Sequence, residues 1–227
     1  MLKKLSLAVA VASATLSSIA YAETVETPVG KLDVTMTATL ATDWINRGRA
    51  LNGAPTVQGS FDVAHESGLY VGIWGGSMEN SEGGSEFDYY IGYAGDITQD
   101  VSFNLTAATY TYPGIAGDDD VELLGSVSAY GATAGVKYLV QTEGDVKSLY
   151  YYAAYDYALP AGFALTASVG NTDPEEGDGF VDWSLGVSKS LAGVDLALTY
   201  ASTDIDEAEC NYHSCENNVA FSLSKTF

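Results

Sequence analysis

The chain has 227 residues, of which 30 are acidic and 9 are basic, and its formal net charge is −21. This balance argues against a nucleic-acid partner, because phosphate binding requires a basic surface. The 16 Tyr and 24 Gly, beside only five Pro, are typical of many short strands and tight turns, and one barrel can use this whole length.

The first 22 residues have the pattern of a cleaved secretory signal peptide. Lys3 and Lys4 form a positive start, an apolar and small-residue run follows, and Ala20-Tyr21-Ala22 fits a cleavage site. A retained membrane helix is the alternative, but the run contains several serines and falls short of the roughly 20 mainly apolar residues of a span. We therefore expect an exported protein whose mature chain comprises residues 23–227.

Twelve segments of alternating apolar and polar residues follow, from about residue 33 to the end. Period two places successive side chains on opposite faces of a strand. The clearest apolar faces lie in residues 34–40, 87–93 and 101–107, whereas glycines dilute the pattern near 57–65 and 69–77. No segment after the leader has 18 consecutive apolar residues, so any membrane insertion would use strands.

The connections between these segments alternate in length. If residue 23 lies on the periplasmic side, the odd-numbered connections are extracellular and mostly long, and the even-numbered ones are short. Short periplasmic turns, longer outer loops and an even strand number characterise bacterial outer-membrane barrels. We therefore predict an all-β protein, a transmembrane antiparallel up-and-down β-barrel of about 12 strands; a soluble β-sandwich has no reason to sort its loops in this way.

Short motifs spread over most of the mature chain form a recognisable set. They are Arg47-Gly48, residues 55–70, Gly72-Ile73-Trp74, residues 87–93, residues 110–114, Val121-Glu122 and residues 222–227. In these motifs the chain resembles the Gcw_chp-type family of exported bacterial proteins, also described as TorF-like porins. The resemblance implies an outer-membrane barrel of porin function and assigns no solute. The chain departs from the family pattern at Ile45-Asn46 and Gly75-Gly76, near the expected outer mouth.

The inward faces of the predicted strands carry more acids than bases. The inward candidates are Asp43, Asp62, Asp88, Glu122, Asp182 and Asp195, together with the cations Arg47 and Lys137. Acidic rings in a pore concentrate cations and oppose anions. We therefore expect a cation-preferring lumen.

Arg47 has two possible roles. It can be an internal strut that pairs with Asp62, Asp88 or Glu122, because a charge in a narrow lumen needs partners, or it can contact solute directly. Asp88 and Glu122 lie at the depth expected for Arg47, and this position favours them as partners.

Aromatic residues on the inward faces can narrow the lumen, serve in packing, or offer their ring faces to a cation or a sugar. Trp74, Tyr90 and Tyr110 are the main candidates, and Tyr130, Tyr150 and Tyr152 also fall on the inward side of the alternation. Twelve strands lie between the eight that side chains fill and the 16 to 18 that leave an open channel. The sequence therefore favours a channel for small hydrophilic solutes over a wide pore.

The expected outer loops are rich in carboxylates, which are hard oxygen ligands able to hold divalent cations at an anionic leaflet. These acids are Glu79, Glu82, Glu86, Asp118, Asp119, Asp120, Glu143, Asp145, Asp173, Glu175, Glu176, Asp178, Asp204, Asp206, Glu207, Glu209 and Glu216. They lack the order of an EF-hand, so solvated acidic loops remain the alternative. Cys210 and Cys215 predict a small disulfide, rather than a metal site with His213 that would offer three soft ligands where structural zinc takes four.

These observations favour a passive outer-membrane channel without cofactor or catalysis. The two histidines, His65 and His213, offer no convincing nucleophile and base pair, which argues against a lipid-processing enzyme. Expected partners are outer-membrane lipid and lipopolysaccharide, the barrel-assembly machinery through the terminal Phe227, and a small hydrophilic solute. The alternative function is a plugged structural barrel or adhesin that acts through its acidic outer loops.

Overall fold

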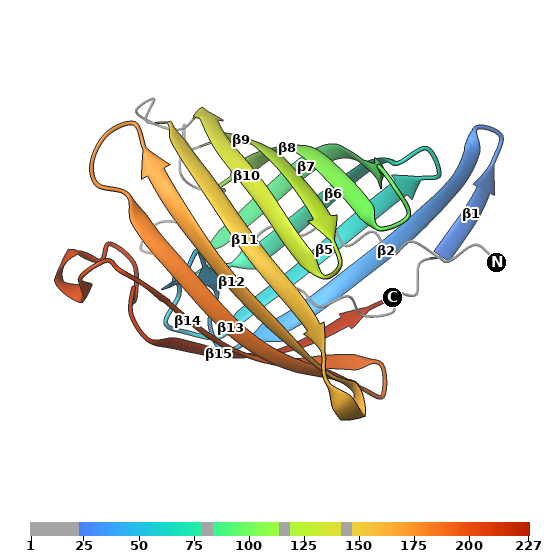
Figure 1. The fold of residues 1–227 in the computed structure, drawn as a ribbon. Coiled ribbons are helices and arrows are strands. Elements are labelled where there is room, and N and C mark those ends of the chain that lie inside the picture. The colour runs from blue at the N-terminus through green and yellow to red at the C-terminus, as the bar shows by residue number, and fades with distance from the viewer. Residues whose placement is uncertain (1–22, 79–83, 114–118, 142–146) are drawn as a thin grey trace.

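The chain folds into a closed antiparallel β-barrel of twelve strands in the computed structural model (Figure 1). The structure describes residues 23–78, 84–113, 119–141 and 147–227. Among these residues, no helix is long and apolar enough to cross a membrane.

The barrel strands follow one another around the wall in chain order, each paired with its neighbours. They are β2 (Gly30–Ala41), β5 (Thr56–His65), β6 (Leu69–Ser77), β7 (Ser85–Asp96), β8 (Val101–Thr111), β9 (Asp120–Ala129), β10 (Ala132–Gln141), β11 (Ser148–Ala158), β12 (Phe163–Pro174), β13 (Phe180–Leu191), β14 (Val194–Thr203) and β15 (Asn218–Thr226). Three shorter strands, β1 (Glu23–Thr27), β3 (Ile45–Asn46) and β4 (Arg49–Ala50), and two 3₁₀ turns, η2 (Pro160–Gly162) and η3 (Glu207–Glu209), complete the described elements. The prediction of about 12 barrel strands is confirmed.

Strand β2 closes the barrel because it pairs along both of its edges. One edge pairs with β5 over Leu32–Ala41, and the other pairs with β15 over Thr37–Ala41. Met36 and Phe227 then exchange two backbone hydrogen bonds, of 3.3 and 2.8 Å. Beyond this point β1 occupies the same edge, with Glu23 opposite Val34. The sequence pattern predicts the first strand from about residue 33. In the structure the first barrel strand, β2, begins earlier, at Gly30, and the short strand β1 precedes it.

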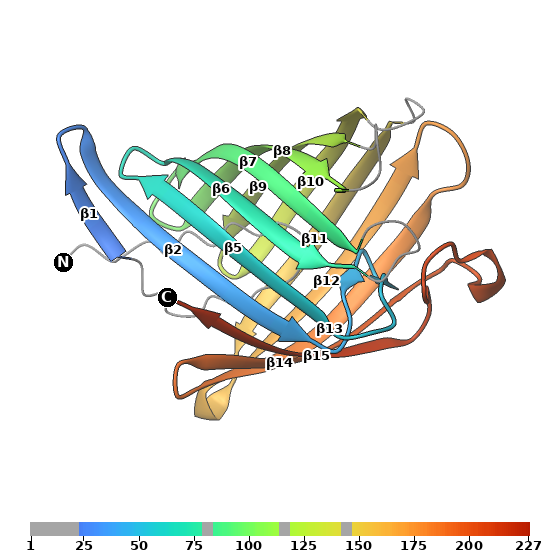
Figure 2. The same ribbon diagram turned by 180° about the vertical axis from the view of Figure 1, so that it is seen from behind.

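The connections sort by length onto the two ends of the barrel (Figure 2). Residues 66–68, 97–100, 130–131, 159–162 and 192–193 make the short turns at the end where β2 begins and β15 ends, and the longer connections join the strands at the other end. Two of the short turns, Tyr130-Gly131 and Ala192-Gly193, have positive φ at both residues, as in the type I′ turns that match the twist of paired strands. Tyr130 was expected to face the lumen and instead lies exposed in its turn, because the tight hairpin removes it from the strand alternation.

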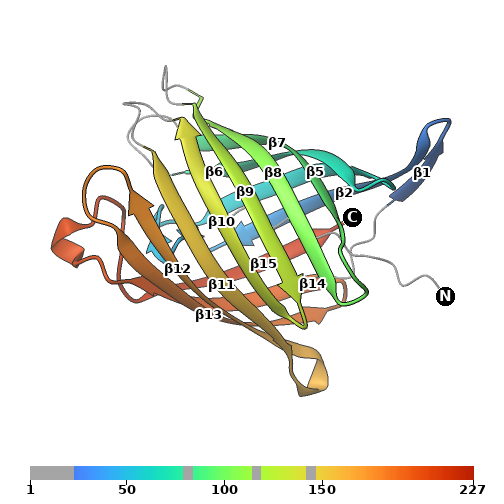
Figure 3. The ribbon, with the colours of Figure 1, turned by 45° about the horizontal axis from the view of Figure 1, so that its top comes forward.

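In strand β7 the alternation of residues in the sequence produces an exposed outer face and a buried inner face. Phe87, Tyr89, Ile91 and Tyr93 are exposed on the outer surface, while the residues between them are buried inside. Similar exposed apolar residues lie on the strands that tilt across the wall in Figure 3, including Leu105, Val127, Val136, Leu185 and Leu198. An apolar outer band around a polar interior is the pattern of a barrel that spans lipid.

Glycines opposite tyrosines shape part of the interior. In the β6–β7 pair, Tyr70 lies opposite Gly92, and Tyr90 lies opposite Gly72. Each ring packs over its glycine, since a Cβ atom at Gly92 would lie 2.2 Å from the Tyr70 ring and one at Gly72 would lie 2.4 Å from the Tyr90 ring. The two tyrosines form a buried cluster with Ala94 and Ala108. These glycines therefore create the space that inward tyrosines fill.

We predict that Gly92→Ala lowers the free energy of unfolding by about 1–3 kcal/mol, because the added methyl group would meet both the Tyr70 ring and the Leu105 carbonyl. Gly125→Ala is the matched control, since its methyl group would find ordinary contact, 3.4 Å from Leu105. Urea unfolding in detergent micelles, followed by tyrosine and tryptophan fluorescence, measures both. Equal stability of the two variants would contradict this account of the Gly-Tyr pairs.

Candidate functional site

The long connection between β2 and β5, residues 42–55, folds into the mouth of the barrel (Figure 2). Its strands β3 and β4 form a small hairpin, and Trp44 and Ala50 are buried although they belong to a connection. Asp43 organises the base of the hairpin, where its carboxylate accepts hydrogen bonds from the backbone N–H groups of Trp44, Asn52 and Gly53. Asp43 is therefore engaged within the loop, and the structure does not bring it into contact with the other inward charges.

The hairpin is fixed to the barrel wall by hydrogen bonds on two sides. Ala50 and Ser214 exchange backbone hydrogen bonds of 2.8 and 3.3 Å, and the Asn218 side chain donates to the Gly48 carbonyl at 2.9 Å. On the opposite side, the Asn52 side chain donates to the Ser77 carbonyl at 2.9 Å. These contacts hold the hairpin as a fixed part of the interior.

The turn of the hairpin requires glycine and presents Arg47. Gly48 has φ +78°, and a Cβ atom there would lie 2.4 Å from the Ser202 carbonyl, so the backbone approaches β14 more closely than any other residue permits. Arg47 itself has φ +46°, a conformation that non-glycine residues adopt at a cost. Gly48 therefore lets the turn of the hairpin pass close to β14, and this position places the Arg47 guanidinium inside the barrel.

Arg47 forms a buried ion pair with Glu122 of β9. Its Nη2 atom lies 2.6 Å from Glu122 Oε1, and the side chains are 17% and 4% exposed. The other carboxylate oxygen of Glu122 accepts from the Tyr110 hydroxyl at 2.8 Å, and the Arg47 guanidinium lies over the Tyr150 ring, 4.5 Å from its centroid. Of the three acids proposed from the sequence as partners of Arg47, Glu122 is the one that the structure pairs with it.

Three more of the predicted charges are buried near this pair. Asp182 accepts from the Tyr150 hydroxyl at 3.3 Å, and the Lys137 ammonium lies 5.9 Å from the centroid of the same ring. Asp88 is 2% exposed, and one oxygen each of Asp88 and Asp182 has no hydrogen-bond partner in the described part of the chain. Buried charges of both signs therefore meet at one level of the interior, around the tip of the hairpin.

The remaining predicted residues lie apart from this group. Asp62 accepts hydrogen bonds from the hydroxyls of Ser60, at 2.8 Å, and Tyr90. Trp74 packs against Trp44 of the inward loop, with 4.9 Å between ring centroids. Asp62 and Tyr90 thus form a second polar contact on the β5–β7 side, and Trp74 supports the hairpin.

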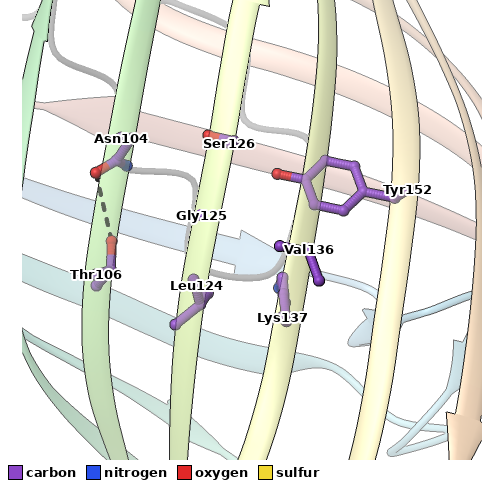
Figure 4. A pocket seen from close by; sticks show the side chains of 8 residues that line it. All are labelled: Asn104, Thr106, Leu124, Gly125, Ser126, Val136, Lys137 and Tyr152. Carbon is purple, nitrogen blue, oxygen red and sulfur yellow. Dashed lines mark hydrogen bonds between the residues drawn. The ribbon is translucent and has the colours of Figure 1, made fainter.

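A small cavity lies beside Lys137. Figure 4 shows a cavity lined by Asn104, Thr106 and Leu124 on one side and by Lys137 and Tyr152 on the other. Its volume is about 20 Å³, which is room for about one water molecule.

Several residues that build the site had no signal in the alternation pattern. They are Trp44, Gly48, Ala50, Asn52, Ser214 and Asn218, which lie in connections or at a strand end. A period-two pattern carries no information about residues outside strands, and only the Arg47-Gly48 motif pointed to this loop.

The outer loops contain the predicted disulfide between Cys210 and Cys215. Of the acidic residues expected to bind divalent cations, Glu79, Glu82, Asp118, Glu143 and Asp145 lie outside the described residues. In the ranges that the structure describes, no group of three or more His, Cys, Asp or Glu side chains is arranged to hold a metal ion.

A family comparison matches residues 25–227 to Gcw_chp, described as a bacterial protein of unknown function. The chain belongs to the Gcw_chp family. No curated protein matches it by sequence.

Among solved structures, the fold is similar to that of the KdgM porin, with a TM-score of 0.54, 6% identity, and coverage of 85% of this chain and 98% of that one. The KdgM porin in complex with disordered oligogalacturonate gives a TM-score of 0.53, 5% identity, and coverage of 86% and 97%. At such low identity the likeness concerns the fold of the Gcw_chp protein.

We predict that Arg47→Ala lowers the free energy of unfolding by about 2–4 kcal/mol, because it leaves the Glu122 carboxylate buried without its ion pair. Arg47→Ala combined with Glu122→Gln is expected to recover part of that loss, with a coupling energy of about 1–3 kcal/mol between the two sites. Urea unfolding in micelles and the heat-dependent shift in gel mobility measure folding.

Additive effects of the two substitutions would contradict a structural strut. Folding that stays intact in Arg47→Ala while permeation changes would instead assign Arg47 to solute contact.

Proposed function

We propose that the protein is an outer-membrane channel for the passive diffusion of small hydrophilic solutes. The observation that carries this proposal is the closed barrel with an apolar outer band and a charged interior. Such a wall satisfies its backbone hydrogen bonds in lipid and offers polar groups to a solute inside. The porin name of the structurally similar KdgM protein agrees with this proposal.

The charges inside the barrel support a preference for cations. The interior surface carries more acidic than basic side chains. The acids are Asp62, Asp88, Glu122 and Asp182, and the bases are Arg47 and Lys137. Charged rings select ions of the opposite sign. An acidic polysaccharide such as oligogalacturonate, with which the KdgM porin forms a complex, would meet more carboxylates than cations here.

One observation favours the alternative of a plugged barrel that acts through its outer loops. The hairpin of residues 42–55 occupies the mouth, and the charges around it are buried. We favour the channel because polar side chains continue to line the interior between the hairpin level and the short turns, including Asn104, Thr106, Thr166 and Ser188. The plug would then be a constriction that restricts solute size.

The proposed route to the membrane has two parts. Residues 1–22 would direct export as a cleaved signal peptide, and the terminal Phe227 would serve as a recognition element for the barrel-assembly machinery. The exposed ring of Phe227, at the end of the closing strand, is accessible for such recognition. Lipid and lipopolysaccharide would surround the apolar band, and divalent cations are candidate partners of the acidic outer loops.

The test of the channel is a planar bilayer that contains the purified protein, with the reversal potential measured across a KCl gradient. We expect small conductance steps and a permeability for K⁺ about 2-fold or more above that for Cl⁻. Asp182→Asn should lower this ratio and Lys137→Met should raise it, while Glu175→Gln, in an outer loop, should leave it unchanged.

Anion selectivity would refute the assignment of the lumen charges. Folded protein that gives no conductance steps would favour the plugged barrel.

The assembly proposal predicts that Phe227→Ala lowers the amount of folded protein in the outer membrane. Phe221→Ala is the control, because Phe221 is an exposed aromatic residue of the same strand, β15, away from the terminus. Membrane fractionation and heat-dependent gel mobility measure both variants. Equal yields would contradict a special role for the terminal ring.

A further inference from the structure

A pocket of about 560 Å³ opens between the long connections, at the end of the barrel where β13 begins and β14 ends. Three segments line it: Arg49 of the inward hairpin, residues 178–180 at the start of β13, and the connection between β14 and β15. Its volume lies within the range of sites for small molecules, about 300–1,000 Å³. None of Arg47, Glu122 or Lys137 lines the pocket, although Arg49 is close enough to Arg47 and Asp182 for both charges to act on it.

The floor of the pocket is a guanidinium without a carboxylate partner. Arg49 lies between two aromatic rings, 4.9 Å from the centroid of Phe180 and 4.1 Å from that of Tyr212. Its Nε atom donates to the Asn46 carbonyl at 3.5 Å, and no carboxylate of the described residues lies within ion-pair distance. Burial lowers the pKa of Arg49, although arginine keeps its charge in proteins. A shielded cation with donors to spare favours an anionic group of a ligand.

The rim of the pocket carries the opposite charge. Asp204 and Asp206 each accept one backbone hydrogen bond, from Val181 at 2.7 Å and from Ala208 at 2.9 Å, and line the pocket. Asp178 and Glu209 also line it, and no side-chain hydrogen bond or ion pair joins either of them to the described residues. This rim repels polyanions and attracts ammonium groups.

The loop that forms one wall is held in shape before any ligand binds. The disulfide joins Cys210 to Cys215, and Glu207 accepts backbone hydrogen bonds from Cys215 and Glu216, both at 3.1 Å. A preformed wall reduces the ordering cost of binding.

We propose that this pocket binds a small zwitterion, with its carboxylate on Arg49 and its ammonium among Asp178, Asp206 and Glu209. The guanidinium requires an anion, and the acidic rim disfavours anions that do not also carry a cation. A small molecule that carries both charges can pair its carboxylate with Arg49 and its ammonium with the acidic rim at the same time. This binding does not depend on conduction through the barrel.

The test uses isothermal titration calorimetry on the purified, folded full-length mature chain in detergent. The probes are 4-aminobutyrate, 6-aminohexanoate and 8-aminooctanoate, with hexanoate and hexylamine as controls that carry one charge each. We expect at least one zwitterion to bind about tenfold or more tightly than either control compound, because only it satisfies both charges. Equal affinity for hexanoate or hexylamine, or no binding by any zwitterion, would overturn the proposal.

Paired variants locate the binding. Asp178→Asn combined with Glu209→Gln should weaken zwitterion binding several-fold, whereas Glu175→Gln with Glu176→Gln removes the same charge from acids that do not line the pocket and should leave it unchanged. Arg49→Gln should abolish binding, with folding checked by gel mobility. If Arg49→Gln does not fold, the two double variants decide: equal losses in both would show that general surface charge causes the binding, and would overturn the site.

Discussion

A barrel wall that is apolar on its outer face can lie in lipid only if it pairs every backbone N–H and C=O group within itself, and the rest of this structure follows from that closure. Strand β2 achieves the closure by pairing with β5 along one edge and with β15 and β1 along the other. Once the wall is closed, successive side chains of each strand face either outward or into the barrel. The apolar set of a strand such as β7 faces outward, and its polar and tyrosine set must be accommodated within a barrel of limited width.

The interior accommodates these groups by pairing them and by drawing a loop inside. The Arg47-Glu122 pair is buried, and removing ions from water costs several kcal/mol each unless further hydrogen bonds compensate. Tyr110 and Tyr150 supply such compensation, one through its hydroxyl and the other through its ring. The hairpin that carries Arg47 is in turn held by backbone contacts to the β14–β15 connection. Charge burial and loop placement are therefore parts of one arrangement, which holds the hairpin inside the barrel.

Alternation and connection length were sufficient to predict the barrel and its strand number, because period two is a direct consequence of strand geometry. Of the two segments with the weakest pattern, β5 and β6, the second contains Gly72, which makes room for the Tyr90 ring, so one glycine that obscured the pattern has a packing role. The sequence also limited the partners of Arg47 to three acids. It could not predict the inward hairpin, the position of Asp43 or the turn at Tyr130, since these depend on contacts between distant connections and on turn geometry. Cleavage after Ala22 stays a prediction.

The edge of β2 holds the two ends of the expected mature chain almost in line. Phe227 lies opposite Met36 and Glu23 lies opposite Val34, and both segments run in the same direction along that edge. Strands β15 and β1 are in effect a single strand with one break. A short peptide joining Phe227 to Glu23 would make the polypeptide a ring without altering the wall, and new ends opened in an outer connection away from the inward hairpin, such as residues 175–179, would give a circular permutant with the same barrel.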